Sequence, residues 1–216
     1  MLLTIGCSFT EGEELSNKNV DAWPFKLGTY LNVPVKNLGL GGGSCDYIFR
    51  TAIEQTIKDK YDLIIIEWTE PSRMEVWWEF RNQPVSVTAH SSYGKIGAFQ
   101  WMEDFYKNCY TDFYGYKKQA IQYVALQGYF KSINQRYLFA NLSGFHPHGY
   151  WEEFRESIGP IWNEIDSRYF VDWPHGGFLE WQGDCPRGPG GHPLELGHER
   201  IANKFYEHIR NLGWFS

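Results

Sequence analysis

The 216-residue sequence has no apolar run approaching the roughly 20 residues that a membrane-spanning helix requires. Its first apolar run begins at Leu2, and neither a basic segment nor a cleavage site precedes that run. We therefore expect no membrane partner and a cytoplasmic location.

Basic runs are missing too. The formal net charge is −6 and the isoelectric point is near 5.6. Nonspecific binding to a phosphate backbone depends on clustered Lys and Arg side chains. Nucleic acid is therefore not an expected partner.

Cysteine is scarce, and its four positions form no C-x-x-C pair: Cys7, Cys45, Cys109 and Cys185. This spacing argues against a zinc ribbon and against a dithiol redox motif. His146 and His148 bracket a proline, and with His175 and His192 they could suggest a metal site, but no carboxylate is spaced to join them. A surface loop is the favoured interpretation, and we expect no metal ion.

Glycines are clustered at 39–43, but the sequence lacks the features of a nucleotide-binding loop there. No lysine follows the cluster, and no G-x-G-x-x-G pattern with an acidic partner fits. A tight turn is the better interpretation, so no cofactor is expected.

Apolar and aromatic residues are plentiful. Hydrophobic residues make up 43% of the chain, which is enough for one domain over residues 1–216. Aromatic residues reach 18%, with 10 tryptophans, and many lie between Trp68 and Tyr137. Aromatic rings at this density fill a core or line a binding cleft.

Strand and helix patterns alternate along the chain. Short apolar runs predict strands at 2–5, 33–38, 61–66, 137–140 and 169–171. Helical patterns with capping residues are expected at about 21–31, 44–57, 116–134, 151–165 and 194–211. This order predicts a doubly wound α/β fold, a flavodoxin-like three-layer sandwich with about five parallel strands.

Residues 70–115 interrupt the alternation. They contain Trp77, Trp78 and Trp101, several glycines and one further predicted strand at 85–87. We interpret this segment as an aromatic-rich insertion at the carboxyl edge of the sheet. Its tryptophans either form the core of the insertion or stack on sugar rings beside a cleft.

Several chemically capable residues follow the carboxyl ends of predicted strands or open the last helix: Ser8, Gly42, Thr69 and His192. A parallel sheet brings such positions to one rim. A serine hydroxyl needs an imidazole to take its proton, and N–H donors must stabilise the oxyanion that forms. Ser8 at a helix start offers its own N–H group, and Gly42 lets a second backbone segment approach closely.

Three motifs resemble those of the SGNH (GDSL-like) hydrolase family. Residues 6–12 (GCSFTEG) resemble the block that carries the family's nucleophile, although Cys7 stands where the family often has aspartate. Residues 37–44 (NLGLGGGS) resemble the second block, and HP at 192–193 with GHERIA at 197–202 resembles the last. The resemblance implies Ser8 as nucleophile, His192 as general base, and the N–H groups of Ser8 and Gly42 as the oxyanion hole.

Two positions depart from that family pattern. The third block usually carries an asparagine that donates to the oxyanion, whereas here Thr69 is the residue that could donate one hydrogen bond. The family also has an aspartate three residues before the histidine, and Pro189 occupies that position. Asp184 is the nearest upstream acid, and the alternative is a Ser–His dyad that uses a backbone carbonyl.

Other assignments of these residues remain open. Ser8 could cap the first helix. Cys7 could replace it as nucleophile if its thiol pKa were depressed, but neighbouring residues on a turn point apart and only one can face His192. His198 is expected to pack or cap within the last helix rather than react.

The sequence thus predicts a serine esterase or acetylesterase that cleaves a small acyl ester through an acyl-Ser8 intermediate. The family resemblance, together with the aromatic residues expected at the cleft rim, implies an O-acetylated carbohydrate or a similar polar ester as substrate rather than a long-chain lipid. The compact form also resembles domains encoded by bacteriophages, which would place the protein in the virion or the host cell. The alternative is a binding or virion-associated protein that retains the fold without activity.

Overall fold

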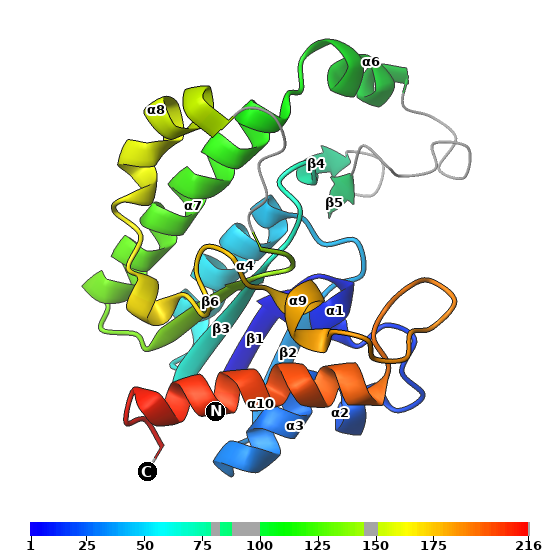
Figure 1. The fold of residues 1–216 in the computed structure, drawn as a ribbon, viewed down its shortest axis with the longest axis vertical. Helices are drawn as coiled ribbons and strands as arrows, with labels where there is room; N and C mark the ends of the chain where they lie inside the picture. The colour runs from blue at the N-terminus through cyan, green and yellow to red at the C-terminus, as the bar shows by residue number, and fades with distance from the viewer. Residues whose placement is uncertain (79–82, 88–99, 145–150, 216) are drawn as a thin grey trace.

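The structure is a computed structural model that describes residues 1–78, 83–87, 100–144 and 151–215. Four parallel strands form the central sheet in the order β2-β1-β3-β6 (Figure 1). Their bounds are Val35–Gly39 for β2, Leu2–Gly6 for β1, Leu63–Trp68 for β3 and Tyr137–Asn141 for β6. Because all four run the same way, their carboxyl ends lie at one edge of the sheet.

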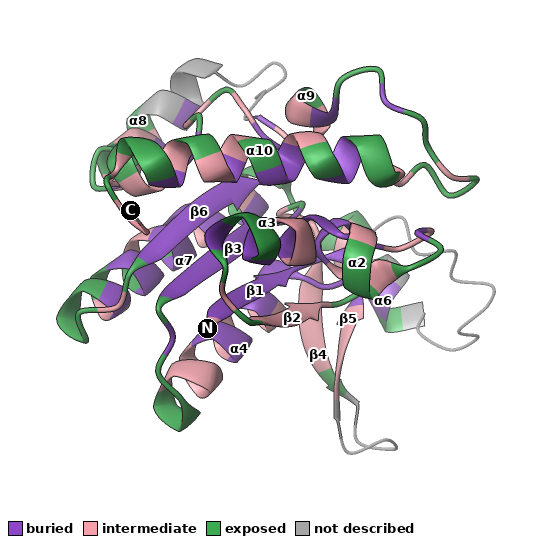
Figure 2. Ribbon diagram, turned by 90° about the horizontal axis from the view of Figure 1, so that it is seen from below, coloured by how far each residue is buried: buried purple, intermediate pink, exposed green. Residues whose placement is uncertain are grey.

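Strands β1, β3 and β6 are buried along their whole length, whereas β2, at one edge of the sheet, is half-buried (Figure 2). In β3 the run Leu63–Ile66 presents branched side chains to both faces of the sheet, as a central parallel strand requires. The register aligns Ile5 of β1 with Ile66 of β3, which brings the segments that follow these strands together.

Helices cover both faces of the sheet, which gives three layers. On one face, α3 (Trp23–Leu31) and α10 (Glu195–Asn211) pack in a core with Leu63 and Ile65. On the other, α4 (Cys45–Lys58) and α7 (Asp112–Ser132) pack with Ile64 and Ile66. The predicted flavodoxin-like three-layer architecture is confirmed.

Local sequence signals account for several helix ends. Pro24 stands in the first turn of α3, and Asn32 ends that helix in a left-handed conformation. The side chains of Ser44 and Thr111 each accept a hydrogen bond from a backbone N–H and so cap α4 and α7. The capping Thr111 starts α7 four residues before the predicted position at 116.

The predicted fifth strand at 169–171 is not formed as a strand. Residues Ser167–Tyr169 instead make a short 3₁₀ turn, η2, and Asp172 has a positive φ of 54°. Only Phe170 remains free to bridge to Phe139 of β6. The extended stretch between these two turns is too short for a ladder, so the sheet stops at four strands.

The insertion forms a second, antiparallel sheet. Strands β4 (Met74–Trp78) and β5 (Gln83–Val87) pair with each other and lie beyond the carboxyl ends of the central strands, near the start of α4 (Figure 1). Helix α6 (Gln100–Asn108) follows. In the described part of the chain, no helix is long and apolar enough to cross a membrane.

The remaining helices are short or peripheral. Their bounds are Ser8–Glu11 for α1, Lys18–Asp21 for α2, Trp151–Trp162 for α8 and Phe178–Gln182 for α9.

Candidate functional site

Ser8 lies at the first turn after β1, one of the two inner strands of the sheet. Strand β1 ends at Gly6, Cys7 is the N-cap of α1 in an extended conformation, and Ser8 is the first helical residue. The Ser8 side chain is nearly buried and contacts His192, so it is not the cap of this helix. Its backbone N–H belongs to the first turn, where such groups lack intrahelical acceptors.

His192 reaches Ser8 from the loop between α9 and α10. Its Nε2 lies 2.9 Å from the Ser8 Oγ, across 184 residues of sequence. The loop is held in shape by a bridge between Arg187 and Pro193 and by the bond from the Gly188 N–H to the His192 carbonyl. The ring of Phe9 also packs against the imidazole, with the ring centroids 5.4 Å apart.

Glu14 is the carboxylate that orients His192. Its Oε2 lies 3.0 Å from Nδ1 and accepts the His192 backbone N–H at 3.0 Å, while its Oε1 accepts the Gly190 N–H at 2.6 Å. The hydrogen bond from Gly190, followed by those from His192, lowers the pKa of Glu14. An ionised Glu14 fixes the proton on Nδ1, so the Nε2 lone pair faces the Ser8 hydroxyl.

A second carboxylate lies nearby on the other side of the ring. Glu13 Oε2 is 3.7 Å from His192 Nε2, and the Glu13 side chain is half exposed. It adds negative potential next to this nitrogen.

The glycine loop after β2 leaves one N–H group open. Gly41 N–H donates to Glu11 at 2.7 Å and Gly43 N–H donates to the Leu40 carbonyl at 2.7 Å. Among the described residues no acceptor contacts the N–H of Gly42, whose φ of 72° favours glycine. Leu40 N–H bonds to the Gly6 carbonyl, so this loop lies against the end of β1 beside Ser8.

A buried glutamate holds the turn that carries the serine. Glu67 of β3 is fully buried and accepts hydrogen bonds from the Cys7 N–H at 2.9 Å, the Cys7 thiol at 2.9 Å and the Thr10 hydroxyl at 2.6 Å. Burial raises the pKa of Glu67. Burial likewise raises the pKa of the Cys7 thiol, so this side chain is a protonated donor to Glu67.

Comparison with known proteins rests on structure alone. No family model and no curated protein matches the sequence. The psychrotrophic esterase EstA from Pseudoalteromonas is similar in structure, with a TM-score of 0.57 and 13% identity over 98% of this chain and 97% of that one.

Two further solved structures are similar over nearly the whole chain. Axe2, an acetylxylan esterase from Geobacillus stearothermophilus, gives a TM-score of 0.54 and 16% identity over 96% of this chain and 93% of that one. The structure called TesA gives 0.55 and 15% identity over 98% of both chains. The chain has the SGNH-hydrolase fold.

Within this SGNH-hydrolase fold, the predicted residues are not all brought together. Ser8, His192 and the Gly42 loop meet at the carboxyl edge of the sheet, but Asp184, predicted as the acid, does not reach His192. Its carboxylate lies 3.0 Å from Arg200 Nη1, and its side chain is 95% exposed. The turn at 187–193 closes on itself, which leaves Asp184 on the side of α10.

Thr69, predicted as a further oxyanion donor, follows β3 and is buried, with 3% of its surface exposed. Its hydroxyl has no hydrogen-bond partner among the described residues. Its carbonyl accepts from the Gln119 amide at 2.7 Å. The oxyanion role of Thr69 stays a prediction.

His198 is part of the packing between α10 and α3. It is fully buried, and its Nδ1 accepts the Trp23 N–H at 3.2 Å. Burial lowers the pKa of His198 to about 4. His146 and His148 of the alternative metal site lie outside the described residues; within the described ranges, no group of three or more candidate ligands is placed to hold a metal ion.

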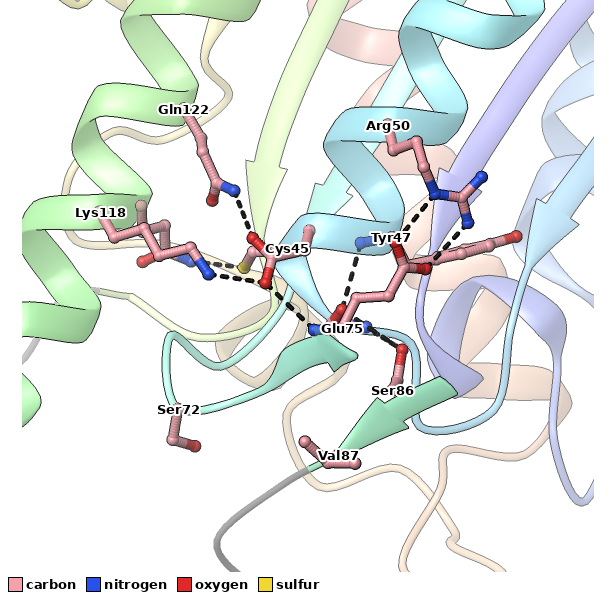
Figure 3. Close-up of polar contacts among 12 residues, drawn as sticks. Cys45, Tyr47, Arg50, Ser72, Glu75, Ser86, Val87, Lys118 and Gln122 are labelled. Atoms are coloured by element: carbon pink, nitrogen blue, oxygen red, sulfur yellow. Dashed lines mark hydrogen bonds and ion pairs between the residues drawn. The ribbon is translucent and has the colours of Figure 1, made fainter. Parts of the chain in front are cut away.

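The inserted hairpin is fixed beside the glycine loop by polar contacts (Figure 3). Arg50 of α4 forms a paired contact with Glu75 of β4, with N–O distances of 2.8 Å. Ser86 of β5 accepts the Ser44 N–H at 3.1 Å and donates to the Ser44 Oγ at 3.3 Å. Ser44 directly follows the glycines, so β5 contacts the segment that contains Gly42.

Asp46 joins this hairpin to the rest of the fold. It accepts from the Glu75 N–H at 3.1 Å, from Lys118 at 2.6 Å and from Gln122 at 2.8 Å, the last two on α7. One carboxylate at the start of α4 therefore connects the hairpin, α4 and α7.

Proposed function

We propose that this protein is a serine hydrolase that cleaves a small acyl ester, with Ser8 as nucleophile, His192 as general base and Glu14 as the acid that orients it. The observation that carries the proposal is the continuous hydrogen-bonded series from Glu14 through His192 to Ser8, with bonds of 3.0 and 2.9 Å. This series matches the roles required of a catalytic triad.

In the first half-reaction, the Ser8 Oγ attacks the ester carbonyl carbon and its proton passes to His192 Nε2. The carbonyl electron pair moves onto oxygen, and we assign the N–H groups of Ser8 and Gly42 to stabilise that oxyanion. When the carbonyl re-forms, the C–O bond to the alcohol breaks. The departing alkoxide takes the proton from His192, leaving an acyl-Ser8 ester.

In the second half-reaction, water attacks the acyl carbon while His192 takes its proton. Collapse of the second oxyanion breaks the bond to Ser8 Oγ, which regains its proton from His192. The products are a carboxylic acid and the regenerated serine. Glu14 stabilises the imidazolium in both halves without itself taking a proton.

The proposal is tested by treating the wild type and Ser8→Ala with a fluorophosphonate probe and with p-nitrophenyl acetate. We expect labelling and turnover in the wild type, and a loss of turnover by at least about a thousandfold in Ser8→Ala. Cys7→Ala should still be labelled. If the wild type is neither labelled by the probe nor hydrolyses the ester, the alternative of an inactive binding protein is supported instead. The absence of the third-block asparagine is the sequence feature that favours this alternative.

A further inference from the structure

Two carboxylates lie against His192, and they differ in how their charge is compensated. Glu14 accepts hydrogen bonds from the backbone N–H groups of Gly190 and His192 and contacts the ring at Nδ1. Glu13 lies at the other nitrogen: its Oε2 is 3.7 Å from Nε2, and its side chain is 46% exposed. Among the described residues, no lysine or arginine forms an ion pair with Glu13. Its negative charge therefore acts on any group that binds beside Nε2.

The Glu13 carboxylate also lies close to the glycine loop. A Cβ atom placed on Gly41 would be 3.2 Å from Glu13 Oε2 and 3.1 Å from Glu11 Oε2. The charge of Glu11 is already compensated, because it pairs with Lys18 at 2.5 Å and accepts the Gly41 N–H at 2.7 Å. Glu13 is thus an uncompensated carboxylate between the general base and the loop that carries the proposed oxyanion donor.

The proposed mechanism brings the alcohol part of the ester to this carboxylate. The departing alkoxide takes its proton from His192 Nε2, so its oxygen lies roughly 2.6–3.2 Å from that nitrogen at this step. Glu13 Oε2 lies 3.7 Å from the same nitrogen, on which Ser8 Oγ also lies at 2.9 Å. A charged group two or three bonds beyond the leaving oxygen is therefore within the Debye length of about 8 Å from Glu13.

On the basis of the proposed function, we infer that Glu13 determines substrate specificity by favouring esters whose alcohol part carries a positive charge close to the ester oxygen. An amino or quaternary ammonium group there pairs with a carboxylate that has no other cationic partner, whereas an anionic group meets a like charge. The formal net charge of −6 adds the same preference at longer range.

The test compares two acetate esters of the same shape: acetylcholine, and 3,3-dimethylbutyl acetate, in which carbon replaces the charged nitrogen. We expect the wild type to have the higher kcat/KM for acetylcholine. In Glu13→Gln, kcat/KM for acetylcholine divided by kcat/KM for the neutral ester should fall about two- to fivefold, because the carboxylate is partly exposed. Glu13→Lys should lower the ratio further. The matched control is Glu207→Gln, which removes an exposed glutamate of α10 and should keep the wild-type ratio.

Salt dependence separates an effect of charge from an effect of shape. Raising sodium chloride from about 20 mM to about 500 mM shortens the Debye length from about 20 Å to about 4 Å. The ratio for the wild type should fall over this range, and the ratio for Glu13→Gln should change much less. An unchanged ratio in folded Glu13→Gln protein at low salt would overturn the inference, as would a wild type that prefers the neutral ester there.

Binding is measured separately, without turnover, by saturation-transfer NMR of choline and of 3,3-dimethylbutanol with Ser8→Ala protein. We expect stronger transfer to choline, reduced when Glu13→Gln is added. If the wild type does not hydrolyse p-nitrophenyl acetate while choline binding still depends on Glu13, the proposed function is refuted and the charge preference of the site stands. If the wild type hydrolyses p-nitrophenyl acetate but neither the ratio nor choline binding depends on Glu13, the inference alone is refuted.

Discussion

At the scale of single residues, Glu14 is in an unusual backbone state. Its φ is 69°, a left-handed conformation that costs a non-glycine residue roughly 1–2 kcal/mol. Three hydrogen bonds from Gly190 and His192 hold its carboxylate in place. The strained backbone turns this side chain toward a loop that is 178 residues away in the sequence.

We expect Glu14→Gln to lower kcat for p-nitrophenyl acetate by about a hundredfold or more, because an amide does not fix the Nδ1 proton or stabilise the imidazolium. The matched control is Asp184→Asn, which removes an exposed carboxylate paired with Arg200 and should leave kcat unchanged. A large loss in the Asp184 variant and none in the Glu14 variant would reverse this assignment.

How far the sequence predicts the site also becomes clear at this scale. Ser8, Gly42 and His192 lie in short contiguous motifs, so local pattern was enough to nominate them. Glu14 belongs to no such motif; its role depends on a positive φ and on a distant loop. The only advance signal was that acidic residues follow the serine closely, at Glu11, Glu13 and Glu14.

Cys7 and Glu67 show a similar non-local effect. The family often has an aspartate at the position of Cys7, and here Cys7 is hydrogen-bonded to a carboxylate of β3. Glu67 bonds both the thiol and the backbone N–H of Cys7. This contact between Glu67 and Cys7 depends on the register between β3 and β1, which cannot be read directly from the sequence.

At the scale of elements, the β4–β5 hairpin supports the glycine loop. Ser86 bonds both the N–H and the hydroxyl of Ser44, and the hairpin is held to α4 by the pair of Arg50 and Glu75. The sequence predicted an insertion here and one of its strands, but not its partner strand or its contacts. The polar residues that dock it are spread over three separate segments, so no local pattern marks them.

We expect Ser86→Ala to lower kcat for p-nitrophenyl acetate a few-fold with little change in KM, because a loosened Ser44 lets the Gly42 N–H leave its position for the oxyanion. The melting temperature should change little, since Ser86 is not fully buried. Ser132→Ala, which removes an exposed hydroxyl at the end of α7, is the control. An unchanged kcat in the Ser86 variant would show that the hairpin does not hold the Gly42 N–H in position.

At the scale of the whole molecule, His198, which is buried where α10 packs on α3, makes the free energy of unfolding depend on pH in the acidic range. Burial lowers its pKa to about 4, against about 6.5 in an unfolded chain. The folded state keeps the neutral ring, so its contribution to stability is complete above pH 6.5 and is lost as the pH falls toward 4. The total loss is about 3 kcal/mol.

His198→Gln keeps an acceptor for the Trp23 N–H and removes the titrating group. Between pH 7 and pH 5, we expect the free energy of unfolding of the wild type to fall by about 2 kcal/mol more than that of the variant. Urea unfolding at both pH values measures this difference. Equal changes in the two proteins would contradict it, and His175→Gln, an exposed histidine, should follow the wild type.

The bond between Ser8 and His192 has a consequence for folding. Ser8 and Glu14 come from one short segment near the start of the chain, whereas His192 arrives from a loop near its end, 184 residues away. The reactive pair therefore exists only after the longest-range contact of the site has closed. If the proposed function holds, ester turnover should appear during refolding only when this loop has closed. Spectroscopic signals from the strands and helices formed earlier should appear before turnover does.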